Sequence, residues 1–295
     1  MLLFSEGGHH TPAIVEFINH YIGEPVLHFE QTYTKPIWDK IFAYFNTNAE
    51  KVFGPYTAET AIPWYTVMFV IACLLTIATI WILKGKLSED APKNGQLTLE
   101  AGFLTLKEMI EDIVGSQGMK YFPVVATFAI LILISNLMGF FPLFMAPTAS
   151  TSVTFALGIS SFIYYNYVGI SENGIVKHLA HLAGPIWWMA WFIFPLELIS
   201  NFIRPLSLSI RLFGNIFADE QVAATVAGLG HSLGLPEWST QLLIPIPLMI
   251  LGLLVCFVQA FVFTLLSMIY LSEVSHGDHE HDEEHGHGEV AEAHA

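Results

Sequence analysis

Long, largely uncharged apolar segments constrain the fold of this chain more than any other feature of its sequence. Charged residues make up 13% of the chain, whereas soluble domains contain about 25%. A helix needs about 20 consecutive apolar residues to cross the hydrocarbon core of a bilayer. The segments that meet this length are 62–83, 121–146, 151–170, 185–228 and 238–272. The sequence therefore predicts an all-α membrane protein with five to six membrane helices.

The last two of these segments are too long to cross a bilayer upright. A straight helix over 238–272 would be roughly 50 Å long, whereas the hydrocarbon core is about 30 Å thick. Such a helix must tilt strongly, or it must break at Pro245, Pro247 or Gly252. Segment 185–228 is similarly long if it is unbroken. We therefore expect the two to form a long, strongly tilted hairpin.

The remaining segments frame a membrane domain over residues 61–272. Residues 1–60 form a polar and aromatic extension, with surface helices expected over 11–21 and 37–45. Residues 97–115 carry apolar side chains at helical spacing and charges on the other face, which is typical of an amphipathic helix that lies on the membrane or packs on the bundle. The tail, 273–295, is rich in histidine and acidic residues and is expected to be disordered.

The tail histidines are weak candidates for a metal site because their spacing is irregular. A solvated tail is therefore favoured over a metal-binding role, and no other metal or cofactor is expected. The candidate ligands would be His279, His281, His285 and His287.

Lysine placement predicts the orientation of the chain. Lysines concentrate between the first two spans, at positions 84, 86, 93, 107 and 120, and another follows the third span at Lys177. By the positive-inside rule these loops are cytoplasmic, which places the N-terminus outside and the C-terminus in the cytoplasm. The net charge of -15 argues against nucleic acid as a partner, since nucleic-acid binding requires a basic surface.

Only two arginines occur in the chain, Arg204 and Arg211, and both lie in the fourth segment. An arginine near the centre of a bilayer costs about 2.5–3.5 kcal/mol on insertion scales, and its side chain cannot lose its proton. Such a charge persists where an ion pathway or a partner carboxylate requires it. A face at helical spacing joins the arginines to other polar residues. Its members are Glu197, Asn201, Arg204, Leu208, Arg211 and Asn215.

Further polar residues lie around Arg211 and on the last segment. Ser207 precedes Arg211 by one turn, and Asp219 and Glu220 lie farther along the same helix. Gln259, on the last segment, lies about as far past the connecting turn as Arg211 lies before it. In an antiparallel hairpin the two should meet at similar depth. A lone glutamine in a membrane helix often only forms a hydrogen bond between helices. The similar depth of Arg211 and Gln259 instead favours one site that contains both.

Three motifs resemble subunit a of the F-type rotary ATP synthases, of the bacterial type. They read PLSLSIRLFGNIFADE, QAFVFTLLSMIYL and NLMGFFP. The resemblance implies a non-catalytic stator subunit of the inner membrane, with two offset half-channels for protons. It also implies that the partners are a ring of c subunits and b-type subunits of the peripheral stalk.

The resemblance also implies roles for individual residues. Arg211 resembles the essential stator arginine, Gln259 the glutamine that faces it, and Glu197 the acidic residue near the cytoplasmic exit. Asn215 and Glu220 resemble polar residues of the outer half-channel.

One position departs from the family pattern. Many bacterial relatives carry a histidine where this chain has Gly252. Asp219 and His231 are therefore the candidates for the missing titratable group.

Three other functions are alternatives to this interpretation. A sodium-translocating version of the same subunit stays open, because the groups that select the ion lie mainly on the rotor. A divalent-metal transporter would need ligands within the spans, and outside the arginine segment the spans have neither histidine nor paired acids. A purely structural scaffold leaves Arg211 unexplained.

Overall fold

The computed structural model describes residues 12–44, 47, 51, 57, 61–85, 93–141, 144–182, 187–232 and 245–275. Five helices within these ranges are long and apolar enough to cross a membrane, as predicted. The spans are Trp64–Lys84, Gly118–Phe140, Thr151–Glu172, Trp191–Ala218 and Met249–Glu273. The chain is therefore an all-α membrane protein.

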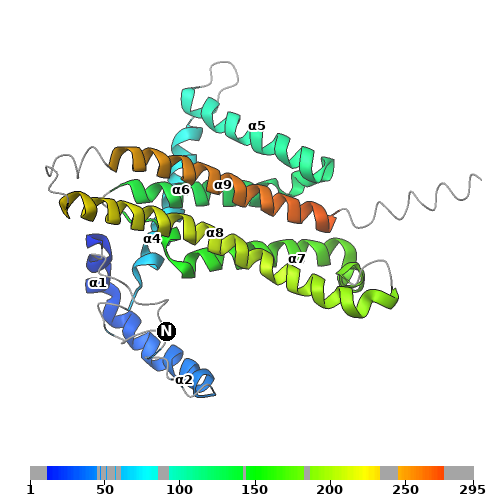
Figure 1. Ribbon diagram of the computed structural model, residues 1–295, viewed down its shortest axis with the longest axis horizontal. Coiled ribbons are helices and arrows are strands. Elements are labelled where there is room, and N and C mark those ends of the chain that lie inside the picture. Colours follow the sequence, from blue (N-terminus) through cyan, green and yellow to red (C-terminus); the bar gives the residue numbers. More distant parts are fainter. Residues whose placement is uncertain are drawn as a thin grey trace, which may run out of the picture.

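The spans belong to helices that are often longer than the apolar segment itself. The first is α4 (Trp64–Lys84), and the second is α6 (Phe122–Leu137), which short 3₁₀ turns flank on both sides. The other three are α7 (Thr151–Leu182), α8 (Ala190–Ser232) and α9 (Pro245–Ser275). Figure 1 shows α6, α7, α8 and α9 lying side by side, with α4 running across their common direction.

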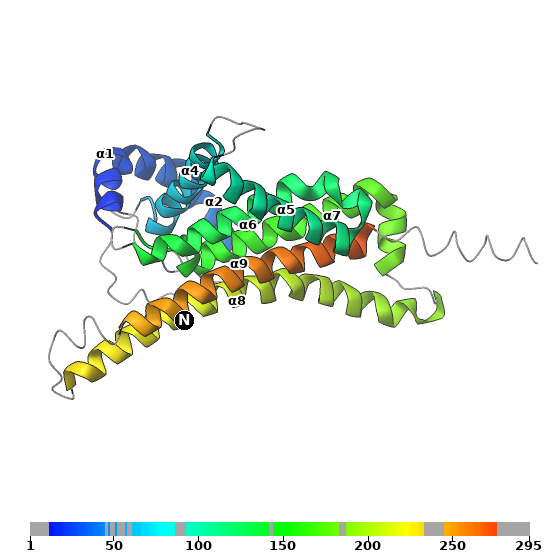
Figure 2. The ribbon, with the colours of Figure 1, turned by 90° about the horizontal axis from the view of Figure 1, so that it is seen from above.

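Helix α8 confirms that the fourth segment is longer than a bilayer is thick. Helix α8 contains 43 residues and has Pro195 and Pro205 in its interior. At 1.5 Å per residue it is about 65 Å long, twice the thickness of a hydrocarbon core. Prolines bend helices, and Figure 2 shows α8 bowed, with its concave side turned away from α6 and α7.

Helix α9 begins at the first of the three expected break points. It starts at Pro245 and continues through Pro247 and Gly252 without interruption. Residues 238–244 lie outside the described residues. Proline is tolerated in the first turn of a helix because the N–H that it lacks has no intrahelical acceptor there.

The second span ends earlier than the sequence predicts. It was expected to reach residue 146, but its helical part ends in a 3₁₀ turn at Phe140, and Phe141 is extended (φ -96°, ψ 126°). Phe141 precedes Pro142, and the α conformation is disfavoured for a residue before proline. The third span was expected to end at residue 170 and ends at Glu172; α7 then continues to Leu182 beyond a break at Gly174, where φ is 75°.

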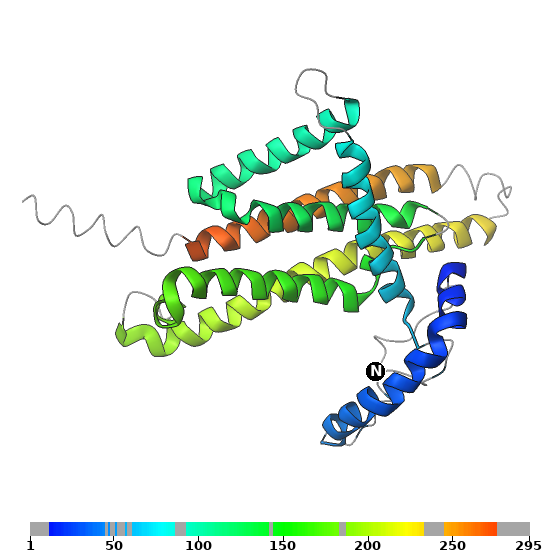
Figure 3. The same cartoon turned by 180° about the vertical axis from the view of Figure 1, so that it is seen from behind.

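The N-terminal extension, in which one or two surface helices were expected, contains one continuous helical segment. Helix α1 (Ala13–Phe29) continues through a π-helical turn (Glu30–Thr34) into α2 (Lys35–Ala43). Asn19 anchors this segment to the residues before α4, because its side chain donates to the carbonyl of Ile62 (3.1 Å) and accepts from the Ile62 N–H (3.0 Å). Figures 1 and 3 show α1 and α2 at one end of α4 and α5 at the other.

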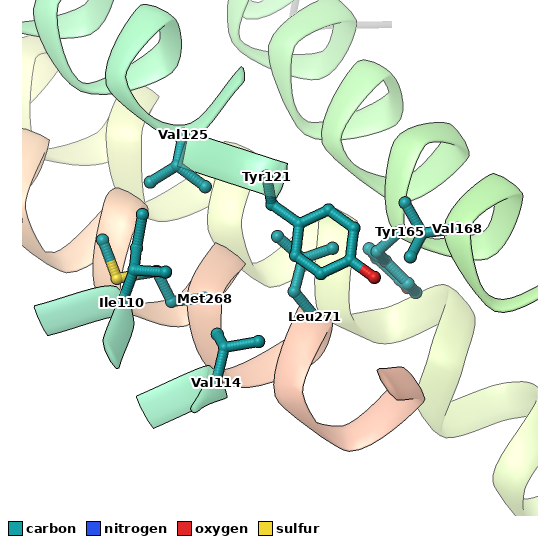
Figure 4. Packing of buried hydrophobic residues seen from close by; sticks show 8 residues of the cluster. All are labelled: Ile110, Val114, Tyr121, Val125, Tyr165, Val168, Met268 and Leu271. Carbon is teal, nitrogen blue, oxygen red and sulfur yellow. The ribbon is translucent and has the colours of Figure 1, made fainter. Parts of the chain in front are cut away.

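The amphipathic helix predicted over 97–115 is α5 (Asn94–Val114), and its last turns pack on the bundle. Ile110 and Val114 are buried against Met268 and Leu271 of α9, as Figure 4 shows. The cluster is Ile110, Val114, Tyr121, Val125, Tyr165, Val168, Met268 and Leu271. Of the two predicted placements, packing on the bundle is thus confirmed for this end of α5.

Candidate functional site

Helix α8 is held between α7 and α9 by apolar side chains on one of its faces. Leu208 and Leu212 are buried in a cluster with Leu157 of α7 and with Ala260 and Phe263 of α9. This packing fixes the rotation of α8 about its axis. The polar row predicted from helical spacing therefore has a defined position relative to α9.

Arg204 is paired with carboxylates of its own chain. Its Nη1 donates to Glu273 Oε2 (2.6 Å) and its Nη2 to Glu273 Oε1 (2.9 Å), a bidentate contact between α8 and α9. The same Nη2 lies 3.3 Å from Glu197 Oε1, and the guanidinium lies over the ring of Tyr270. These contacts offset the cost of a cation in a membrane-spanning helix.

Glu273 corrects the predicted boundary of the tail. The sequence analysis assigned residues 273–295 to a disordered tail, but α9 extends to Ser275. Glu273 lies in its last turn, and its carboxylate binds the guanidinium of Arg204. The rest of the tail, with its candidate histidines, lies outside the described residues.

Arg211 has no such partner within the described part of the chain. Its side chain is exposed, and no carboxylate among the described residues lies within 4.0 Å of it. Apart from Ser207, one turn before it, the exposed side chains around it on α8 are apolar, among them Leu206, Ile210 and Phe217. Arg211 is therefore a charge on a largely apolar face of a membrane-spanning helix.

Gln259 meets the polar row one turn beyond Arg211. Asn215 Nδ2 donates to Gln259 Oε1 at 2.7 Å, and the side chain of Gln259 is buried (2% exposed). Among the described residues its Nε2 has no hydrogen-bond partner. The expected similarity in depth between Arg211 and Gln259 is thus found to within one helical turn, although the direct partner of Gln259 is Asn215.

The other predicted site residues also lie on these two helices. Ser207 is exposed on α8, one turn before Arg211. Asp219, Glu220 and His231 lie farther along α8, and their side chains are outside the described set. Gly252 is buried within α9.

The exposed surface of the α8–α9 hairpin is strongly apolar. More than a dozen large apolar side chains of these helices are over a third exposed, including Phe202, Ile203, Leu254 and Phe261. Apolar surfaces of this extent face lipid or another apolar protein surface. In the described part of the chain no group of three or more His, Cys, Asp or Glu side chains could hold a metal ion.

Comparison with known proteins identifies the family. A family model described as ATP synthase A chain matches residues 66–272. The chain belongs to this family. Its members are the non-catalytic, ion-translocating subunit of the ATP synthase membrane sector. This chain is thus a multi-pass membrane protein of the ATP synthase complex.

The chain is also similar to curated relatives over most of its length. It is 42% identical to ATP synthase subunit a 2 of Syntrophotalea carbinolica over 181 residues, which are 61% of this chain and 73% of the relative. It is 39% identical to subunit a of Geobacter sulfurreducens over 202 residues (68% and 82%). It is 38% identical to subunit a of Solibacter usitatus over 217 residues (73% and 89%).

Two contacts in the structure were not predicted from the sequence. One is the pairing of Arg204 with Glu273, for which the signal was a carboxylate near the end of the last apolar segment. The other is a buried hydrogen bond of 2.5 Å from the Tyr165 hydroxyl to Asn201 Oδ1. Asn201 was placed on the polar row, but nothing in the spacing of α7 singled out Tyr165.

Proposed function

We propose that this subunit is the stator part of a proton channel and that Arg211 couples proton flow to rotation of a ring of c subunits. The observation that carries the proposal is the exposed Arg211, which has no carboxylate partner among the described residues and lies on the apolar face of a long, bowed helix. An apolar ring surface of complementary curvature would cover this face. A carboxylate on that ring would supply the missing counter-charge.

The physics of an ionisable group in a membrane gives the mechanism. A rotor carboxylate must be neutral while it faces lipid, because an exposed charge there costs several kcal/mol. Beside Arg211 the ionised form is stabilised by the opposite charge. The rotor group therefore releases its proton on approaching Arg211 and takes up another after passing it. A membrane potential contributes about 2.3 kcal/mol per charge per 100 mV, which biases the direction.

Two half-channels would lead to the opposite sides of Arg211. We assign Glu197 and Ser207 to the cytoplasmic side, toward the start of α8. Asn215, Gln259, Asp219 and Glu220 would line the outer side. The Asn215–Gln259 hydrogen bond supports a polar route there, since it places amide groups within an otherwise apolar helix contact.

Gly252 brings no titratable group to the outer path. We propose that Asp219 or His231, both on α8, supplies it.

The location and the partners follow from the same proposal. The subunit would lie in the inner membrane, with its N-terminus outside and its C-terminus in the cytoplasm. Subunits of the b type would hold it against the ring. A sodium-translocating version would show synthesis that depends on sodium at constant pH.

Replacement of Arg211 with alanine tests the proposal. We expect Arg211→Ala to abolish gradient-driven ATP synthesis while the complex still assembles, because the counter-charge for the rotor carboxylate is lost. Passive proton leak through the membrane sector should persist or rise.

The matched control for this test is Ile210→Ala, which truncates the adjacent exposed side chain. It should leave coupling nearly intact. Normal coupled synthesis in Arg211→Ala membranes would refute the assignment.

A further inference from the structure

An exposed apolar stripe runs along the N-terminal helical segment, α1 to α2, which lies entirely before the region matched by the family model. Its large apolar side chains recur mostly at four-residue intervals. Their exposed fractions range from 46% to 67%, and the residues are Phe17, Tyr21, Ile22, Phe29, Tyr33, Ile37 and Ile41. Ring contacts join successive members of the stripe, with centroids 4.8 Å apart for Phe17–Tyr21 and 5.2 Å apart for Phe29–Tyr33.

The π-helical turn Glu30–Thr34 keeps this stripe on one side of the segment. In an α-helix, residues four apart are rotated by about 40° beyond a full turn, so a long stripe at this spacing winds around the axis. The additional residue of a π turn sets the following helix back by about 100°. Tyr33, Ile37 and Ile41 thereby stay in line with Ile22 and Phe29.

The side of the segment that faces away from Ile22 and Phe29 is polar and exposed, with Phe17 and Tyr21 at its edge. Its polar residues are Glu16, His20, Glu24, His28 and Gln31. A third side, with Val15, Asn19 and Gly23, is buried against the rest of the protein. The segment is therefore amphipathic outside its buried contact.

The buried side fixes the depth of the segment relative to the membrane. Val15 packs in a cluster with Val67 and Met68, which lie in the first turns of the membrane-spanning helix α4. Asn19 binds Ile62, two residues before α4 begins. The segment therefore starts at the level where α4 enters the hydrocarbon region.

We propose that the helical segment from Ala13 to Ala43 lies in the membrane interface and inserts this stripe into the headgroup–acyl boundary of the leaflet at which α4 begins. Amphipathic helices of this kind bury one apolar face about 5–10 Å into that boundary. Tyrosine, with an apolar ring and a polar hydroxyl, is enriched at this depth. Lipid is the occupant because the anchoring contacts hold the segment at the end of α4, a membrane-spanning helix whose own exposed side chains, such as Val70, Leu74 and Ile77, are apolar.

Site-directed fluorescence in the full complex tests this proposal. In a background with Cys73→Ala and Cys256→Ala, a cysteine replaces Tyr33 on the stripe or Gln31 on the polar side, and each carries an environment-sensitive fluorophore. We expect quenching by lipids brominated in the acyl chains to be several-fold stronger at position 33 than at position 31. Quenching by aqueous iodide should show the reverse order.

A second matched pair repeats the comparison on α1 and guards against a local folding defect. Phe29→Cys should behave like Tyr33→Cys, and Glu24→Cys like Gln31→Cys. Equal quenching of both members by brominated lipid would overturn the proposal. Protection of the stripe from both quenchers would also overturn it, because a protein surface would then cover the stripe.

Discussion

Addition of a single methyl group at Gly158 should displace the helix that carries Arg211. Gly158 lies on α7 and faces α8. Among the described glycines, it leaves the least room for an added Cβ. An ideal Cβ at this position would lie 2.2 Å from Ser209 Oγ and 2.8 Å from the carbonyl oxygen of Pro205. Ser209 precedes Arg211 by two residues, so a shift of α8 here also moves Arg211.

The structure gives the magnitude of the effect. The Ser209 hydroxyl can rotate away, although it then loses its hydrogen bond to the Pro205 carbonyl (2.7 Å). The Pro205 carbonyl is backbone, so α7 and α8 must separate by about 0.6 Å to restore an ordinary contact of 3.4 Å from 2.8 Å. Overpacking of a tight contact costs about 1–3 kcal/mol, and the helix propensity of alanine returns up to about 1 kcal/mol. We expect Gly158→Ala to destabilise the subunit by about 1–2 kcal/mol.

The assay compares thermal stability with ATP synthesis per assembled complex. A lower unfolding midpoint should accompany a several-fold lower synthesis rate, because sub-ångström misplacement of a reacting group is costly. Gly102→Ala on α5 is the control, since a Cβ there meets no atom within 4 Å. It should leave both quantities unchanged or raise stability slightly. Wild-type stability and synthesis in Gly158→Ala would show that α7 and α8 are not in contact at this level.

Three further predictions concern the ends of the hairpin and its centre. Glu273→Gln removes the charge that Arg204 binds. Because the pair is half-buried, the unfolding free energy should fall by about 1–2 kcal/mol. An unchanged midpoint of thermal unfolding would contradict the pairing. Asn215→Ala leaves the buried Gln259 Oε1 without its donor, and a double-mutant cycle with Gln259→Ala should give a coupling energy near 0.6 kcal/mol, whereas zero would exclude the hydrogen bond. The sequence after Ser275 is expected to be a disordered, charged tail, so its truncation should leave ATP-driven proton pumping nearly unchanged. A severe loss in an assembled complex would assign the tail a function.

The spans were predictable because hydropathy is a local property of the chain. A charge-free run of sufficient length can be recognised without any knowledge of its neighbours, and all five predicted spans correspond to helices. Their ends were less predictable. The helical part of the second span stops before Pro142, because local backbone geometry and not hydropathy ends a helix. Helix α7 is interrupted at Gly174, a glycine at positive φ, and then continues.

The polar row was predictable for a related reason, while its partners were not. Spacing alone placed Arg204, Arg211 and Asn215 on one face of α8, and counting from the connecting turn brought Gln259 to similar depth. Glu273 was assigned to the tail because it is followed by an acidic, histidine-rich sequence. Its membership of α9 depends on a contact with a residue far away in the sequence, which no local pattern records.

The two arginines of α8 differ in whether their charge is paired within the described part of the subunit. Arg204 has two carboxylates of its own chain within 3.3 Å and an aromatic ring beneath it, so its charge is satisfied within the subunit. Arg211, two turns along, has no carboxylate within 4.0 Å among the described residues and projects from an apolar face. A guanidinium cannot deprotonate to escape this environment. A carboxylate from outside the described residues would stabilise this charge, and a rotor carboxylate that arrives and leaves in turn would meet that need.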